Sequence, residues 1–395
     1  MDSNETQPGS RLRRISRRGP RETSRKLPVL KLKGTPREIG YSHGEQAQDK
    51  IRHNIQVYFR RFKNETQLSK DEALIRAEKY LRVIQRTSPD YAKTMEGVAM
   101  GSKTKLLEIT ALNVRYELMY SQFAKIGLRP VPHSGGCTAF GAMPEATVNR
   151  HLLMAQNWDW IPQVEGLFLK IRPDSGPDTL SFTEAGVVGG KIGLNSNGIG
   201  LAINGLVSSK DDWERLRKPF HVRCWEILRS KTISEGVSKI TRGERSCSAN
   251  FLIGQQSSLG AGNLVDVESA PESTITLSPK NGIFGHTNHF TRPEELGVKQ
   301  VLDVERWSTL HRYKRITKLL EEMRSGNGKL NMTRAEVMLR DHDGKPESVC
   351  RHPNSKFPED ERYQSVVSVI MDLYTAQLRA TTGSPCENQY QTIRL

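Results

Sequence analysis

The first third of the chain spaces its apolar residues with the period of a helix. Residues 28–33 alternate apolar and polar positions and predict a short strand. Thr35, Pro36 and Glu38 then form a helix start, with a capping hydroxyl, a proline in the first turn and a glutamate three residues after the cap. From there to about residue 117, apolar side chains recur three and four positions apart. We therefore expect several packed helices in this part.

Beyond residue 137 the pattern changes to short apolar runs separated by turn residues, which is typical of strands. Helical spacing returns at residues 220–242 and 307–323, and the runs at 365–373 and 377–381 predict a closing hairpin. Helices therefore come first, followed by strands with a helical insert and then strands again, without an internal repeat. This order predicts an α+β fold in which helices and sheets are sandwiched together.

Composition excludes several protein classes. The chain has 395 residues, enough for an ample core, and no run approaches the roughly 18 apolar residues that a membrane span needs. Residues 1–27 lack the apolar stretch of a secretory signal, so we expect a cytoplasmic protein without a membrane span. The final Ile393-Arg394-Leu395 resembles a peroxisomal S-K-L-type address, although isoleucine replaces the usual small residue, which makes the peroxisome the alternative location.

The formal net charge of +15 is concentrated near the N-terminus, where residues 1–35 carry ten Lys and Arg against three Asp and Glu. Such an arm can bind nucleic acid or acidic membrane. No aromatic residue is interleaved with its arginines as a stacking surface would require. We therefore interpret residues 1–27 as a solvated, disordered tail and do not expect nucleic acid as a partner.

The cysteines and histidines do not predict a metal site. The five cysteines contain no C-x-x-C pair, which favours a reducing interior over a disulfide framework. His286 and His289 lack a nearby third ligand, and the cluster formed by 341–343 with 350–352 lacks the paired spacing of a zinc site. We expect a polar loop at that cluster and no bound metal or other cofactor.

Two segments could carry chemistry. In Ser134-Gly135-Gly136-Cys137, two glycines permit tight backbone geometry immediately before a thiol that opens a predicted strand. About twenty residues later, 156–160 read Q-N-W-D-W, a polar and acidic group at a strand end. Taken alone, Gly-Gly-Cys predicts a buried structural cysteine after a turn.

The order of six motifs changes that interpretation. They are G-C-T-A-F, Q-N-W-D-W, K-I-G-L-N-S-N-G-I-G-L-A-I-N, H-T-N-H-F, H-R-Y-K-R-I and D-H-D-G-K-P-E-S-V-C-R-H. In this order the chain resembles the isopenicillin N acyltransferase family, whose members are self-processing acyltransferases and hydrolases of the N-terminal-nucleophile class. The resemblance runs from about residue 29 to residue 388, which leaves out the basic tail.

The resemblance implies a four-layer α-β-β-α sandwich with a helical N-terminal segment, and a precursor that cuts itself between Gly136 and Cys137. Residues 28–136 would then belong to the small subunit and 137–395 would form the catalytic core, with the two pieces remaining associated. Cys137 would become both N-terminus and nucleophile. A free α-amine titrates near 7.7–8.0 and can take the thiol proton close to neutral pH.

The resemblance also implies roles for other residues. Asp159 would orient the amine and thiol, Asn288 would bind the developing oxyanion, and Arg312 would place a fixed positive charge near the nucleophile. Taken singly, these residues could equally cap a turn, bond the backbone and pair a surface acid. Three residues are weaker candidates for the same pocket: Asn204, Gln156 and Ser308. Gln156 stands where the related bile-salt and penicillin V hydrolases carry arginine, which argues against bile-salt specificity.

We therefore predict a cysteine N-terminal-nucleophile enzyme that forms or exchanges amide bonds through a thioester on Cys137. Its partners would be a small-molecule acyl donor, with acyl-coenzyme A as a possible co-substrate, and an amine acceptor of secondary metabolism. The alternative is an amidohydrolase that uses water and no coenzyme A. A third alternative, outside enzymes, is a binding protein that uses its basic arm and would bind nucleic acid or anionic lipid in a salt-sensitive way.

Overall fold

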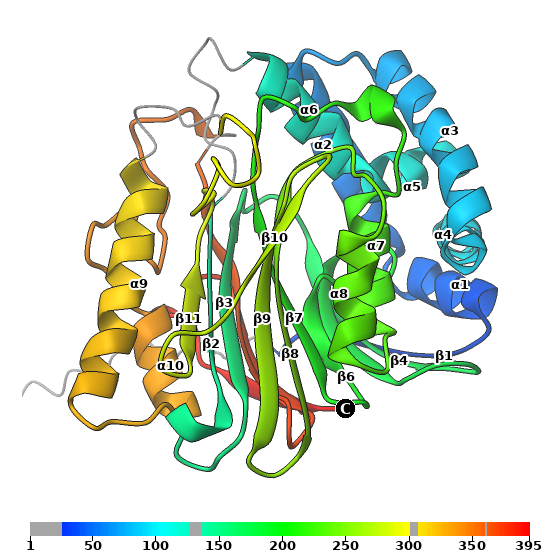
Figure 1. Ribbon diagram of the computed structural model, residues 1–395. Helices are drawn as coiled ribbons and strands as arrows, with labels where there is room; N and C mark the ends of the chain where they lie inside the picture. Colours follow the sequence, from blue (N-terminus) through cyan, green and yellow to red (C-terminus); the bar gives the residue numbers. More distant parts are fainter. Residues whose placement is uncertain (1–25, 127–135, 301–306, 360–361) are drawn as a thin grey trace, which may run out of the picture.

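The computed structural model describes residues 26–126, 136–300, 307–359 and 362–395 (Figure 1). Nearly all of the predicted basic tail, and the segment immediately before Gly136, lie outside the described residues. The first described element, β1 (Val29–Gly34), is the strand expected from the alternating pattern. Thr35 and Glu38 form the predicted reciprocal capping box at the start of the first helix, with Pro36 in its first turn.

Helices dominate the segment after β1. They are α1 (Pro36–Gln46), α2 (Gln48–Thr66), α3 (Lys70–Thr87), α4 (Pro89–Ser102), α5 (Leu106–Asn113) and α6 (Arg115–Ile126). Helices α1 and α4 pack unusually closely, because a Cβ on Gly40 would lie 2.1 Å from the carbonyl oxygen of Thr94 and one on Gly97 would lie 2.3 Å from that of Arg37. Only glycine fits at these crossing points, so the two helices are held backbone to backbone.

Two sheets follow. The first has the strand order β1-β4-β5-β6-β7-β8-β9-β10, in which β1 joins β4 in parallel and the other pairings are antiparallel. Its later strands are β4 (Gly166–Pro173), β5 (Thr179–Glu184), β6 (Ile192–Asn195), β7 (Ile199–Gly205), β8 (Ala249–Ser258), β9 (Ala261–Ser269) and β10 (Thr274–Leu277). The N-terminal segment thus supplies an edge strand of this sheet.

The second sheet is antiparallel throughout, with the order β11-β2-β3-β12-β13-β14. Its strands are β2 (Cys137–Ala142), β3 (Leu153–Trp160), β11 (Ile283–His286), β12 (Gln364–Asp372), β13 (Gln377–Thr382) and β14 (Gln391–Arg394). The predicted closing hairpin is β12 with β13. Strands β2 and β3 are buried along their whole length, as expected for a sheet covered on both faces.

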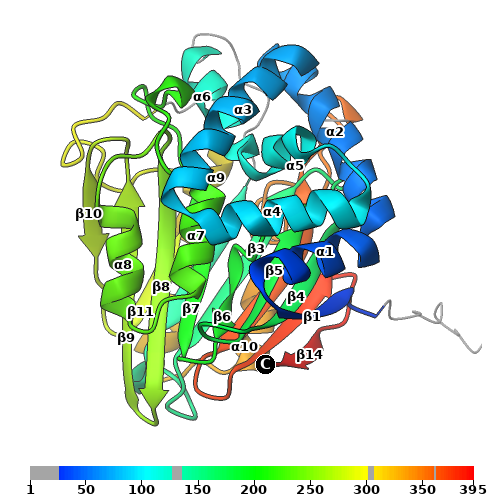
Figure 2. The ribbon, with the colours of Figure 1, turned by 90° about the vertical axis from the view of Figure 1, so that its right-hand side faces the viewer.

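The layers follow the order helix, sheet, sheet, helix, which confirms the predicted α+β sandwich (Figures 1 and 2). Helices α9 (Trp307–Ser325) and α10 (Met332–Leu339) cover the sheet that contains β2, whereas α7 (Phe220–Leu228) and α8 (Ile233–Thr241) cover the other sheet. Two short 3-10 helices complete the described elements: η1 (Pro144–Ala146) and η2 (Trp213–Arg215).

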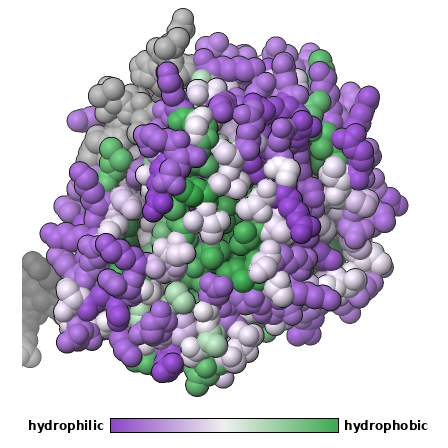
Figure 3. Space-filling view, in the orientation of Figure 1, coloured by the Kyte–Doolittle hydropathy of each residue, from purple (hydrophilic) through white to green (hydrophobic). Residues whose placement is uncertain are grey.

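The main apolar core lies between the two sheets and beneath the N-terminal helices, where side chains such as Phe168, Leu201, Phe251 and Val369 are buried. Figure 3 shows apolar side chains gathered over the strands between the two helical layers, with hydrophilic residues over the helices. Among the residues that the structure describes, no helix is both long enough and apolar enough to cross a membrane.

Candidate active site

Three side chains form hydrogen bonds to the backbone of Cys137 at the start of β2. Its amide nitrogen donates to Oδ1 of Asn288 at 2.6 Å. Its carbonyl oxygen accepts from Nη1 of Arg312 at 2.7 Å and from Nδ2 of Asn204 at 3.1 Å. Asn288 follows β11, Arg312 lies on α9 and Asn204 lies on β7, so both sheets and one outer helix converge on this residue.

Gly136 occupies a crowded, charged position on the other side of the same peptide bond. Its carbonyl oxygen accepts a hydrogen bond from the backbone N–H of Asp159 at 2.8 Å. A Cβ at this position would lie 2.7 Å from Nη1 of Arg351, 2.9 Å from Oδ2 of Asp159 and 3.2 Å from Nη2 of Arg312. Glycine is therefore the residue that fits between these three charged groups.

Asp159 ends β3 next to that bond and is fully buried. Its Oδ1 accepts from Oγ of Ser365 at 2.7 Å, while Oδ2 has no hydrogen-bond partner among the described residues. Burial raises the pKa of Asp159 to about 7, against the opposing effect of Arg312 and Arg351. A carboxylate with a free oxygen and a near-neutral pKa is suited to accept a proton.

The thiol of Cys137 is buried, and burial raises its pKa to about 12, with the negative charge of Asp159 acting in the same direction. The backbone N–H of Asp159 and the charges of Arg312 and Lys191 oppose this rise. In the uncut chain the thiol is therefore protonated at neutral pH, and its own nitrogen is an amide without a basic lone pair. A base has to come from elsewhere until a free amine exists.

Arg312 links most of the predicted residues. Its Nη2 donates to Oδ1 of Asn288 at 3.1 Å and its Nε to Oγ of Ser308 at 3.2 Å. Ser308 in turn donates to the carbonyl oxygen of Glu347 at 3.2 Å, so this serine contacts the arginine and not Cys137. Burial lowers the pKa of Arg312, while Asp159 opposes this effect. The predicted group of Cys137, Asp159, Asn288 and Arg312 is thus brought together.

The side-chain amides of Gln156 and Asn288 bond to backbone atoms of the other sheet and do not point into a substrate pocket. Gln156 donates to the carbonyl oxygen of Ile203 at 2.5 Å and accepts from its N–H at 3.0 Å, so its amide ties β3 to β7 across the two sheets. The amide nitrogen of Asn288 donates to the carbonyl oxygen of Gly205 at 3.1 Å. In the uncut chain it is the oxygen of Asn288, and not its nitrogen, that faces Cys137.

A small cavity of about 20 Å³ opens beside Cys137. This volume holds about one water molecule. Aromatic rings form much of its wall, and two buried cations, Arg115 and Lys191, also line it. A larger apolar cavity of about 110 Å³, lined in part by Leu32 and Trp225, contains none of the predicted site residues.

Sequence reasoning did not find Lys191, which lines the cavity with its Nζ 3.3 Å from the centroid of the Trp158 ring. Lys191 and Arg115 both pair with Glu184, which also accepts from the hydroxyl of Tyr58. Burial lowers the pKa of Lys191 to about 7, against the opposing effect of Glu184. The K-I-G-L-N motif contains this lysine, but nothing in the motif identifies its partner.

Arg351 is the second residue that sequence reasoning missed. It pairs with Glu347 on the loop after α10, and its guanidinium lies against Gly136. The backbone of this loop is held near the site, because Arg351 N–H donates to Oγ of Ser365 at 3.0 Å, the same hydroxyl that donates to Asp159. Its position within the V-C-R-H motif is the sequence feature that could have identified Arg351 as a site residue.

Comparison with known proteins places the chain among acyl-transferring enzymes. Residues 146–386, more than half of the chain, match the family model described as acyl-coenzyme A:6-aminopenicillanic acid acyl-transferase. The matched range begins after Cys137, so it does not cover the candidate nucleophile. The chain is 28% identical over 327 residues to the Emericella nidulans acyl-coenzyme A:6-aminopenicillanic-acid-acyltransferase 40 kDa form. This alignment covers 80% of this chain and 83% of that protein.

Solved structures with a similar arrangement are more distant. A Caenorhabditis elegans N-acylethanolamine-hydrolyzing acid amidase ortholog aligns over 60% of this chain and 93% of its own, at 12% identity and a TM-score of 0.45. Penicillin V acylase from Agrobacterium tumefaciens aligns over 62% of this chain and 83% of its own, at 14% identity and a TM-score of 0.40.

Proposed function

Because the chain belongs to the acyl-coenzyme A:6-aminopenicillanic acid acyl-transferase family, we propose that it processes itself and then makes or breaks amide bonds through a thioester on Cys137. The coarse class, an enzyme of the acyltransferase and amide-hydrolase type, follows from family membership. The nucleophile, the self-cleavage and the chemistry of the acceptor are the proposal, and they are supported by the contacts around Gly136 and Cys137.

The first step is the cut. The thiol of Cys137 attacks the carbonyl carbon of Gly136, a C–S bond forms, the C–N bond breaks, and the proton of the thiol ends on the released nitrogen. Water then hydrolyses this internal thioester and leaves a carboxylate on Gly136 and a free amine on Cys137. The N–H of Asp159 already donates to the Gly136 oxygen, where negative charge develops, and Asp159 Oδ2 is available to carry the thiol proton.

In the mature enzyme the new amine replaces Asp159 as the base. Free α-amines titrate near 7.7–8.0, so a substantial fraction is neutral close to pH 7.5 and can take the thiol proton. Oδ1 of Asn288 already accepts from this nitrogen and would orient the amine. The positive charge of Arg312 and the cation of Lys191 favour the thiolate.

Asn288 could also donate to the oxyanion of an acyl substrate, as the family resemblance implies. In the uncut chain its amide nitrogen is taken by the Gly205 carbonyl. We propose that in the mature enzyme Asn288 releases the Gly205 carbonyl, so that its Nδ2 can donate to the oxyanion. Removing one oxyanion donor typically costs about 10²–10³ in rate.

The observation that carries the proposal is the geometry at residues 136 and 137: a glycine between three charged groups, followed by a buried thiol whose nitrogen and carbonyl are both held by side chains. A structural cysteine needs none of these contacts. The thioester is tested directly by mixing purified protein with a short acyl-coenzyme A and measuring the mass of the polypeptide that contains residue 137, which is the 137–395 piece in a cut protein and the whole chain in an uncut one.

An added acyl mass that hydroxylamine removes is expected for the wild type and not for Cys137→Ala. Cys247→Ala, which alters another buried cysteine whose thiol donates to the carbonyl oxygen of Glu117, is the matched control and should acylate normally. Measuring the products with and without an added amine separates a transferase, which forms an amide, from an amidohydrolase, which releases the free acid. The small cavity beside Cys137 has room for the water that hydrolysis needs. Acylation that persists in Cys137→Ala would overturn the proposal.

A further inference from the structure

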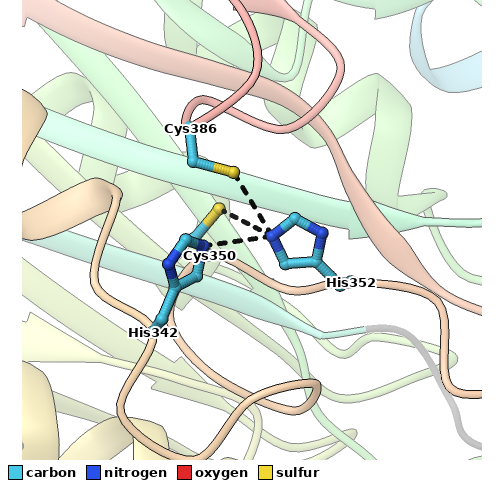
Figure 4. Close-up of side chains that lie close together, drawn as sticks. All are labelled: His342, Cys350, His352 and Cys386. Carbon is cyan, nitrogen blue, oxygen red and sulfur yellow. Dashed lines mark hydrogen bonds between the residues drawn. The ribbon is translucent and has the colours of Figure 1, made fainter. Parts of the chain in front are cut away.

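Four side chains from two distant parts of the sequence point toward one another (Figure 4). They are His342, Cys350, His352 and Cys386, and their nearest ligand-type atoms all lie within 4.8 Å of one another. The first three belong to the loop after α10, and Cys386 follows β13. The sequence spacing concealed the group, because the fourth member is 34 residues from the third.

The contacts within this group exceed what hydrogen bonding can satisfy. Nε2 of His352 lies 3.1 Å from Nε2 of His342, 3.3 Å from Sγ of Cys386 and 3.6 Å from Sγ of Cys350. A ring nitrogen of neutral histidine has either one proton or one lone pair, so it can engage only one of these three neighbours. A cation at the centre would instead satisfy all four ligand atoms at once.

We propose that these four residues form a structural zinc site. Tetrahedral zinc binds thiolate sulfur at about 2.3 Å and histidine nitrogen at about 2.0–2.1 Å. Those bond lengths place two nitrogens about 3.3 Å apart and a sulfur and a nitrogen about 3.6 Å apart. The observed separations of 3.1 Å, 3.3 Å and 3.6 Å are close to these values. Two thiolates also balance the charge of one divalent zinc.

The surroundings fit such a site. Oε1 of Glu387 lies 3.6 Å from Nδ1 of His352, so a carboxylate stands near the second ring nitrogen and would have to move closer to orient a zinc-bound histidine. Cys350 and His352 are buried, whereas His342 and Cys386 are exposed, which leaves a route by which the ion can enter. With two histidines and two cysteines and no open position, the site is closed and structural rather than catalytic.

The site would position the loop that supports the candidate active site. Within that loop the N–H of Cys350 donates to the carbonyl oxygen of Asp341 at 2.9 Å. Arg351, between two of the proposed ligands, contacts Gly136 and shares the Ser365 hydroxyl with Asp159. The zinc would tie this loop to the segment after β13 and so hold Arg351 in place. Arg351 is then a positioning residue for the uncut bond, and the zinc acts on it indirectly.

The test measures metal in the full chain, purified without a histidine tag after growth with added zinc. We expect one zinc per chain by elemental analysis, and X-ray absorption with two sulfur and two nitrogen neighbours. Cobalt(II) substitution should give the visible bands of a tetrahedral thiolate site. Cys386→Ala should lose at least tenfold in zinc content while remaining folded, since this side chain is exposed. Cys247→Ala should keep its zinc.

A second readout separates this inference from the proposed function. Removing zinc with a chelator should increase hydrogen exchange in residues 341–352 and 383–388, whether or not Cys137 is the nucleophile. Three results would each overturn the site. The wild-type protein could bind no zinc from a zinc buffer, Cys350 and Cys386 could form a disulfide in protein purified from a reducing cytoplasm, or Cys386→Ala could retain its full zinc content. None of these results bears on the thioester.

Discussion

Residue 136 has little room, because a Cβ there would lie within 3.2 Å of three charged side chains. Gly136→Ala should therefore block self-cleavage, since a methyl group would displace the Asp159 carboxylate and Arg351 from the bond that is to be cut. We expect at least a hundredfold slower appearance of the 137–395 polypeptide, followed by gel electrophoresis after expression.

The control is Gly326→Ala at the end of α9, where an added Cβ would meet its nearest neighbour at an ordinary 3.4 Å. This variant should process like the wild type. Wild-type processing of Gly136→Ala would mean that the packing around the bond does not govern the cut.

The raised pKa of Asp159 predicts how stability depends on pH. An unfolded aspartate titrates near 3.9, whereas burial raises the pKa of folded Asp159 to about 7. Between these values the folded chain keeps a proton that the unfolded chain loses, so the free energy of unfolding falls as pH rises through this window. In an uncut Cys137→Ala background, Asp159→Asn should remove this fall, measured by urea unfolding at pH values of about 4.5 and 7.

The contrasting result is a free energy of unfolding that depends on pH in the same way with and without Asp159. If uncut Asp159→Asn and its parent lose the same stability between those two pH values, then Asp159 is already ionised throughout, and it could not relay the thiol proton near neutral pH.

Individual residues of the site were predictable to different degrees. Cys137, Asp159, Asn288 and Arg312 lie within ordered motifs, and the structure brings them together. The sequence could not show that Asn288 turns its oxygen toward Cys137, because amide orientation depends on Gly205 in another strand. Arg351 and Cys386 gained their meaning from contacts with Gly136 and His352, which are distant in the sequence, and Lys191 gained its meaning from its place in the cavity beside Cys137.

At the scale of elements, one buried ionic cluster joins the helical segment to the larger sheet. Tyr58 on α2, Arg115 on α6 and Lys191 before β6 all contact Glu184 at the end of β5. The attraction of Arg115 and Lys191 overcomes burial and holds the pKa of Glu184 below its ordinary range. This one carboxylate therefore pairs with two buried cationic side chains.

Glu184→Gln should lower the free energy of unfolding by about 3–5 kcal/mol, because it leaves two buried cations without a counter-charge. Chemical denaturation of the uncut Cys137→Ala protein measures this change. Glu295→Gln breaks a half-exposed pair with Arg292 and should change stability by less than about 0.5 kcal/mol. Equal losses of stability in the two variants would show that the buried cluster does not stabilise the packing of the helical segment against the larger sheet.

The elements themselves were largely predictable, because apolar spacing and capping are local signals. The strand at β1, the capped start of α1, the helix α9 and the hairpin of β12 with β13 are confirmed. The parallel pairing of β1 with β4 was not predictable, since it joins residues more than 130 positions apart. The close glycine crossing of α1 and α4 likewise depends on a contact between distant segments.

At the scale of the whole molecule, the layered fold explains how a cut chain could stay in one piece. Residues before the cut contribute β1 to the larger sheet and helices that cover the core, and residues after it contribute the rest of both sheets. We therefore predict that the two pieces copurify and separate only in denaturant. The family resemblance implied this division of the chain, and it stays a prediction.

The central claim is that Cys137 becomes a chain start whose own amine activates its sulfur. Intact mass spectrometry of the purified, active protein, with N-terminal sequencing, measures this directly. The account predicts two polypeptides, the second beginning with Cys137, and a single uncut polypeptide for Cys137→Ala. A fully active wild-type protein that remains one polypeptide of 395 residues would contradict it.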